Sequence, residues 1–360
     1  MKTKPMTKFA ILALSLVLVA CAGGGSEEAG CPAIDGREIN VVATTPMIGE
    51  FVSQVGGENI NLTVLMPPEA NPHTYEPAPQ DAGTIAEADL VFYTGLLYEP
   101  AALVKLLENS ACSTDILSEV GESVFPIEFK EGGHDDHDDH DDHDDEEGHD
   151  DEEGHDDHDD EEGHDDEEGH DDEEGHDDHE GHNHGAYDPH FWFDPSRVAY
   201  AAEYIESRLI QFDPENESSY ISSADSFVSE LNDLTKQVSE LISTVPSQNR
   251  KLITTHESLG YLEAKFGLEV LSTIIPSLNS ANEISPSDLA GVIDVIEDNN
   301  VKVIFIESEA PSVYSETIVA ETGIKSVTGL YVETLKPGQS YSEFLISNVT
   351  LITENLQDTD

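Results

Sequence analysis

The chain has 360 residues, enough for two domains of ordinary size, and a formal net charge of −62. Residues 131–184 hold 32 of the 77 Asp and Glu residues and no Lys or Arg, and the rest of the chain is still strongly acidic. Because such a surface repels phosphate groups, the composition excludes nucleic acid and anionic membrane surfaces as partners, and it suits a protein that attracts cations.

Residues 1–20 have the pattern of an export signal. Three Lys residues precede an apolar run at 9–20, which is too short to span a bilayer. Small residues precede Cys21, and a flexible Gly/Ser/Glu tether continues to residue 36, as in a bacterial lipoprotein signal. We therefore predict that Cys21 is lipidated and anchors the mature chain to the membrane. The alternative is an ordinary signal in which this cysteine is incidental.

Two cysteines remain, Cys31 and Cys112. An exported protein occupies a compartment where disulfides persist, and two remaining cysteines allow one pairing. We expect a disulfide between them. The alternative is two free thiols, if the fold keeps their Cα atoms more than about 7 Å apart.

Residues 37–212 predict a first α/β lobe. Short β-rich segments alternate with short helical ones, which favours a mostly parallel sheet flanked by helices. A polar, Pro-rich loop at 69–79 follows the second strand. The expected strands are 39–44, 61–66 and 90–94, and the expected helices are 47–55, 80–88, 101–108 and 196–210.

Residues 131–185 interrupt this lobe with a tract of Gly, His, Asp and Glu that holds 13 of the 16 histidines. Low complexity and dense like charge cannot form a packed core, so we predict disorder. We interpret the tract as a weak, multivalent collector of metal ions, dispensable for high-affinity metal binding elsewhere in the chain; a solvated acidic loop is the alternative. Its histidines are His134, His137, His140, His143, His149, His155, His158, His164, His170, His176, His179, His182 and His184.

Residues 213–247 predict a linker helix. Its apolar residues keep helical spacing over 215–245, a length of roughly 45 Å, which is long for a helix that covers one sheet. A second series of strands and helices at 248–360 predicts a second α/β lobe. The expected strands are 251–255, 268–274, 301–306 and 324–331, and the expected helices are 259–266, 287–299 and 315–322.

Three histidines lie outside the tract. His73 lies in the loop after a strand, His256 lies at the end of another strand, and His190 lies in a Pro-bounded aromatic loop. Ligands of α/β sheets bind at the carboxyl ends of the strands, so two facing lobes would bring these imidazoles into one cleft. Three imidazoles and a carboxylate suit zinc. Asp188 and Asp194 flank His190, and either could orient it instead of binding metal.

The segments around these histidines resemble one known family, the metal-binding lipoproteins and periplasmic solute-binding proteins of zinc and manganese ABC importers. The matching segments are 67–81, 188–195, 254–261 and 330–335, and the resemblance runs from residue 39 to the C-terminus apart from the tract. It implies two α/β lobes joined by one long rigid helix, with a metal site in the interlobe cleft. It also implies the ligands His73, His190, His256 and Glu333, the last at a position where the family often has Asp.

The same resemblance implies an extracytoplasmic receptor that delivers Zn(II) to an ABC importer permease without catalysis. We also expect the protein to be a monomer. In this family the third ligand tends to be His in zinc binders and Glu in manganese binders, and here it is His256. Zn(II) is therefore preferred over Mn(II), because imidazole suits zinc whereas manganese favours oxygen ligands. A manganese receptor, a three-His zinc hydrolase with Glu257 as its base, and a metal-dependent adhesion protein are the alternatives. Whether Glu333 or water is the fourth ligand, and whether the setting is periplasmic or the cell exterior, stay open.

Overall fold

The computed structural model describes residues 31, 34, 36–68, 70–129, 187–275, 285–309 and 313–357. The export signal, the lipidation of Cys21, and the tract at 131–185 with its histidines lie outside the described residues. None of the helices in the described part of the chain has the length and apolar character that crossing a membrane requires.

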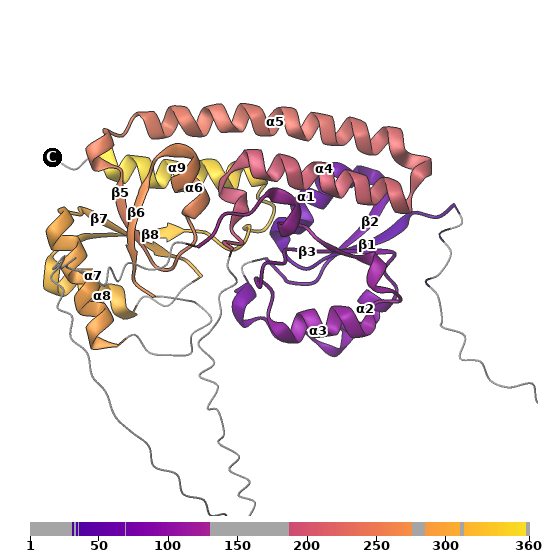
Figure 1. Ribbon diagram of the computed structural model, residues 1–360, viewed down its shortest axis with the longest axis horizontal. Coiled ribbons are helices and arrows are strands. Elements are labelled where there is room, and N and C mark those ends of the chain that lie inside the picture. Colours follow the sequence, from indigo (N-terminus) through magenta and orange to yellow (C-terminus); the bar gives the residue numbers. More distant parts are fainter. Residues whose placement is uncertain are drawn as a thin grey trace, which may run out of the picture.

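The N-terminal lobe is built on a four-stranded sheet in which all strands are parallel (Figure 1). The strands, in spatial order, are β2 (Ile60–Val64), β1 (Ile39–Ala43), β3 (Leu90–Tyr93) and β4 (Leu117–Glu119). Helices α1 and α4 cover one face, and helices α2 and α3 cover the other. These helices are α1 (Pro46–Gly56), α2 (Pro79–Ala86), α3 (Ala101–Ser110) and α4 (Pro195–Phe212).

The C-terminal lobe repeats this plan, again with all four strands parallel. The strands, in spatial order, are β6 (Glu269–Thr273), β5 (Lys251–Thr254), β7 (Val303–Glu307) and β8 (Lys325–Leu330). Helices α7 and α8 cover one face, and helices α6 and α9 lie on the other. These helices are α6 (Gly260–Phe266), α7 (Pro286–Asn299), α8 (Val313–Thr322) and α9 (Tyr341–Gln357). The predicted fold class, two parallel sheets flanked by helices, is confirmed.

Helix α5 (Glu217–Ser243) runs along both lobes and packs on α1 and α4 at one end and on α9 at the other (Figure 1). Its 27 residues span about 40 Å. Its buried residues recur every three or four positions, which gives one apolar stripe along the helix. They are Tyr220, Ala224, Phe227, Leu231, Leu234, Val238 and Ile242. They belong to one apolar core that continues into both lobes, so α5 fastens the lobes together along its length.

Local sequence explains where two helices next to the site begin. Thr45 accepts a hydrogen bond from the backbone N–H of Ile48 (3.2 Å) at the start of α1, and Asp194 accepts one from the backbone N–H of Ser196 (2.9 Å) at the start of α4. A proline follows each cap, at a position where its missing N–H costs nothing. Asp194 is therefore the cap of a helix, which directs its carboxylate away from a ligand role.

Two elements are absent from the sequence predictions. Strand β4 has three residues, too few to show a period. Helix α9 does carry a helical pattern, because Tyr341, Phe344, Leu345, Val349 and Ile352 are all buried, but it follows the last segment for which we predicted an element.

A disulfide joins Cys31 to Cys112, with Cα atoms 5.0 Å apart. It ties the segment that precedes β1 to the residues that follow α3. The N-terminal tether is thus attached to the folded body before the first strand begins.

Candidate metal centre

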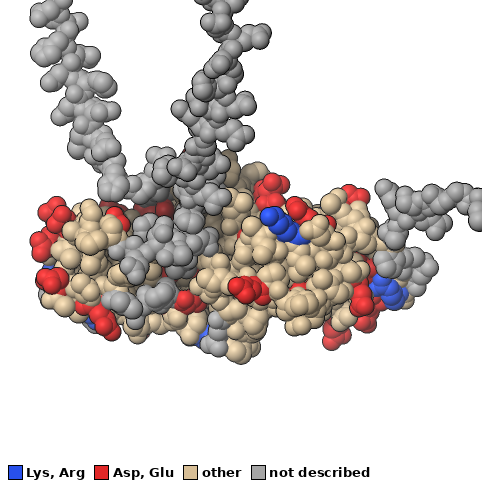
Figure 2. Space-filling model, turned by 90° about the horizontal axis from the view of Figure 1, so that it is seen from below, with Lys and Arg blue, Asp and Glu red and all other residues tan. Residues whose placement is uncertain are grey.

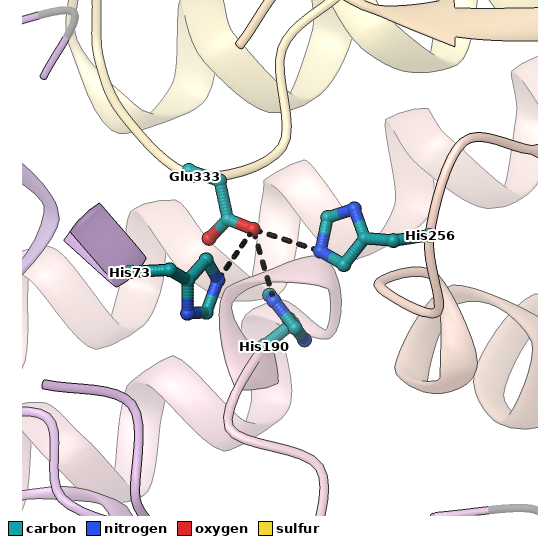
Figure 3. A group of neighbouring side chains, drawn as sticks. All are labelled: His73, His190, His256 and Glu333. Atoms are coloured by element: carbon teal, nitrogen blue, oxygen red, sulfur yellow. Dashed lines mark hydrogen bonds and ion pairs between the residues drawn. The ribbon is translucent and has the colours of Figure 1, made fainter. Parts of the chain in front are cut away.

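Four side chains from both lobes converge on one point (Figure 3). His73 lies in a short 3-10 helix (Pro72–Thr74) after β2, and His190 lies directly before another (Phe191–Phe193). His256 follows β5, and Glu333 follows β8. Ligands of open α/β sheets bind outside the carboxyl ends of the strands, and His73, His256 and Glu333 all follow such ends.

One carboxylate oxygen of Glu333 meets all three imidazoles (Figure 3). Its Oε1 lies 3.0 Å from His73 Nε2, 3.4 Å from His190 Nε2 and 2.8 Å from His256 Nε2. The four donor atoms lie within 4.8 Å of one another. In a tetrahedral zinc site with bonds of about 2.1 Å, ligand atoms are about 3.4 Å apart. A small ion therefore fits among these atoms after a modest adjustment of the side chains.

The donor atoms are buried. The side chains are 9% exposed for His73, 2% for His190, 5% for His256 and 0% for Glu333. Among the described residues, Nε2 of His190 and Nε2 of His256 have no hydrogen-bond partner of acceptable geometry, because a single oxygen cannot accept well from three rings. Buried polar atoms without partners are rare and costly in folded proteins. A cation at this point would bind both nitrogens.

Two of the three histidines are held by a carboxylate behind the ring. Asp188 Oδ1 accepts from Nδ1 (2.7 Å) and from the backbone N–H (2.8 Å) of His190. Glu307 accepts from Nδ1 (2.5 Å) and from the backbone N–H (3.1 Å) of His256. Such contacts fix the orientation of each ring with Nε2 facing Glu333 Oε1, and they increase the basicity of a histidine that would bind metal. His73 has no such carboxylate in the part of the chain that the structure describes, where its buried Nδ1 has no hydrogen-bond partner.

The charges of the cluster shift its pKa values strongly. Burial lowers the pKa of His190, but the carboxylates of Glu333 and Asp188 outweigh it and raise this pKa to about 9. For His256, too, burial is outweighed, by Glu307 and Glu333, and the pKa is raised well above its usual value. Burial acts to raise the pKa of Glu333, but the neighbouring histidines hold it well below its usual value. Without metal, the raised pKa values of His190 and His256 favour their protonated forms beside Glu333.

The loop that carries Glu333 is fixed from several sides. The Tyr98 hydroxyl donates to Glu333 Oε2 (2.9 Å), and Trp192 Nε1 donates to the carbonyl oxygen of Val332 (2.8 Å). Glu309 Oε1 accepts from the backbone N–H groups of Val332 (3.2 Å) and Glu333 (3.3 Å). Burial and the nearby Glu333 carboxylate raise the pKa of Glu309 to about 7.

The four ligands expected from the sequence therefore lie together, and the structure separates the two aspartates that flank His190. Asp188 supports the ring of His190, whereas Asp194 caps α4. Sequence reasoning missed Glu307 as the support of His256 and Tyr98 as the partner of Glu333. Glu307 did carry a signal, because it is a carboxylate at the last position of a strand.

Comparisons with known proteins identify relatives along most of the chain. The family model described as zinc-uptake complex component A, periplasmic (ZnuA) matches residues 41–355. The high-affinity zinc uptake system protein ZnuA of Bacillus subtilis is 26% identical, covering 97% of this chain and 96% of that protein. The manganese-binding lipoprotein MntA of Halalkalibacterium halodurans is 21% identical, covering 97% of each chain.

Among solved structures, the periplasmic zinc-binding protein TroA of Treponema pallidum matches with a TM-score of 0.67 and 20% identity. The match covers 89% of this chain and 99% of TroA, so it shows the same two-lobed fold. Since the family model spans most of the sequence, this chain belongs to the family of zinc-uptake complex component A, ZnuA.

Proposed function

We propose that this protein is the solute-binding component of an ABC-type importer, and that it carries one Zn(II) ion between its lobes to a membrane permease. The observation that carries the proposal is the donor set, in which the Nε2 atoms of three histidines surround one oxygen of Glu333. Zinc is cargo here, and no bond of a substrate is made or broken.

The donor set favours zinc over manganese. Three nitrogens and one oxygen suit a tetrahedral zinc ion, whereas manganese prefers six oxygen-rich positions. Manganese is the second candidate, because relatives named as manganese-binding lipoproteins, such as MntA, align over nearly the whole chain. The carboxylate of Glu333 also occupies the position that a catalytic zinc site keeps for water, which favours transport over the hydrolase alternative.

Competitive titration of the metal-free full chain tests this assignment. We expect each chain to bind one zinc ion tightly, and we expect that an excess of Mn(II) does not displace this ion. A His190→Ala/His256→Ala variant keeps the tract but loses two ligands of the site, so it reports the binding of the tract alone. A tight site in the wild type that prefers Mn(II), or one that survives in the double variant, would contradict the proposal.

We further propose that Cys21 carries a lipid anchor at the outer face of the membrane, and that the body works as a monomer of two lobes, 37–212 and 248–360, with a linker at 213–247.

Acidic side chains occur over both lobes on the face in Figure 2, where Lys and Arg are few, which suits a protein that collects cations. We assign the tract weak metal collection. We expect that deleting residues 131–185 leaves the zinc affinity of the tight site unchanged, and loss of that site would contradict the interpretation that tight binding does not require the tract.

A further inference from the structure

The two carboxylate oxygens of Glu333 have different partners. Oε1 faces the three imidazoles, at 2.8 to 3.4 Å. Oε2 accepts a hydrogen bond from the Tyr98 hydroxyl at 2.9 Å, and the same hydroxyl lies 3.1 Å from the backbone oxygen of Glu333. Tyr98 belongs to the N-terminal lobe and Glu333 to the C-terminal lobe, so this contact also crosses between the lobes.

The ring of Tyr98 is positioned by the site itself. The residue is 1% exposed, and its ring meets those of His73, His190 and Trp192 edge to face, with centroids 5.3, 6.0 and 5.3 Å away. Rotation of the side chain would displace at least one of these rings. The hydroxyl is therefore held where it reaches Oε2 of Glu333.

The backbone of Tyr98 is fixed as well. Its N–H donates to the carbonyl oxygen of Gly95 (2.9 Å), closing a turn in which Gly95, Leu96 and Leu97 all have positive φ. The buried carboxylate of Glu99 accepts from the backbone N–H groups of Thr94 (2.6 Å) and Gly95 (2.9 Å) and holds this turn. Left-handed backbone at two leucines costs energy and persists only where surrounding contacts stabilise it.

We propose that Tyr98 is a positioning residue that limits Glu333 to one metal-binding oxygen and thereby favours zinc over manganese. This inference rests on the proposed function. With Oε2 bound to the hydroxyl, the site offers three nitrogens and one oxygen, the set for a tetrahedral ion. With Oε2 released, the carboxylate can bind through both oxygens, and the site gains the fifth donor and the oxygen character that manganese prefers.

The variant Tyr98→Phe removes the hydroxyl and keeps the ring. Tyr220→Phe is the matched control, because Tyr220 is also buried and its hydroxyl also donates to a carboxylate, Oδ2 of Asp213 (2.6 Å), at the far corner of α4 and α5. Each full-length protein is loaded with less than one equivalent of Co(II), and the spectrum of the His190→Ala/His256→Ala variant is subtracted.

Tetrahedral Co(II) absorbs visible light several times more strongly than five- or six-coordinate Co(II). We expect intense tetrahedral bands for the wild type and Tyr220→Phe, and weak bands for Tyr98→Phe. Loss of a contact behind a metal ligand weakens binding about 10–100-fold. We expect the zinc affinity of Tyr98→Phe to fall by this factor and its Mn(II) affinity to fall less or to rise. The ratio of zinc affinity to Mn(II) affinity should therefore decrease.

Tetrahedral bands and an unchanged zinc-to-manganese preference in Tyr98→Phe would overturn the role of Tyr98 while leaving the zinc carrier intact. Absence of a tight metal site in the wild type would instead overturn the proposed function. X-ray absorption of the zinc-loaded wild type tests the idea without any variant. It should show four nitrogen or oxygen neighbours, and a fifth neighbour from the carboxylate would refute the proposal even if Tyr98→Phe did not fold.

Discussion

Zinc binding at this site is expected to release protons and to strengthen as the pH rises. Burial lowers the pKa of His190, but Glu333 and Asp188 raise it to about 9, so only about 1% of this imidazole is neutral at pH 7. A metal ligand must be unprotonated. Displacing this one proton should reduce the apparent zinc affinity at pH 7 by about 100-fold, which corresponds to about 2.7 kcal/mol. The raised pKa of His256 acts in the same direction.

Calorimetric titration at pH 7 in buffers with different ionisation enthalpies measures the released protons directly. We expect at least one proton per zinc ion, and an apparent affinity that rises about tenfold or more per pH unit between pH 6.5 and 8. The His190→Ala/His256→Ala variant supplies the background of the tract. Binding to the wild type that releases no proton and does not change with pH would refute this reasoning.

The same shift predicts how the stability of the metal-free protein depends on pH. The folded pKa of His190 lies above its unfolded value of about 6.5, so its contribution to stability is fully present below pH 6.5 and is lost as the pH rises toward 9. Thermal denaturation of the metal-free protein should show a falling Tm over this range. A Tm that rises from pH 6.5 to 9 would contradict the charge arrangement.

Three further results are expected. Gly260→Ala would place a Cβ 2.7 Å from Oδ2 of Asp188, the residue that supports His190, so the zinc affinity should fall about tenfold in a competition titration. Gly291→Ala is the control, because a Cβ there would have no heavy atom within 4 Å and should leave the zinc affinity unchanged. Equal zinc affinities of the two variants would contradict the clash with Asp188. Replacing Cys31 and Cys112 with serine should lower the free energy of unfolding in urea by about 2–5 kcal/mol without changing zinc affinity, and an unchanged midpoint would contradict a role of the disulfide in stability. Zinc at about 1,000 times its Kd should stabilise the wild type by about 4 kcal/mol in denaturation with and without a chelator, and equal curves would exclude binding to the folded state.

Much of the fold could be predicted because its signals are local. Alternating β-rich and helical segments predicted seven of the eight strands in the described residues, and the apolar stripe of 215–245 predicted the long helix α5 within two residues at each end. Strand β4 gave no usable period in three residues. The order of strands in each sheet could not be read from such patterns, because it depends on which strands pair across the chain.

The candidate ligands were also local signals. His73, His190 and His256 are the histidines outside the tract, and each occurs in a loop or at a strand end where α/β proteins bind ligands. Glu333 came from the resemblance to a family and not from its own surroundings. The sequence offered no basis for deciding whether Asp188 or Asp194 supports His190, because both aspartates lie within four residues of it.

Composition and local pattern specify the acidic character, the alternation of strands and helices, the long helix, and the histidines available for a metal site, since each of these depends on residues that are neighbours along the chain. The packing of the two lobes selects the carboxylate that meets the imidazoles and the carboxylates that support them. Those roles depend on the direction of side chains across two packed lobes. The Tyr98 hydroxyl reaches Glu333 across 235 positions of sequence, a contact that no local pattern records.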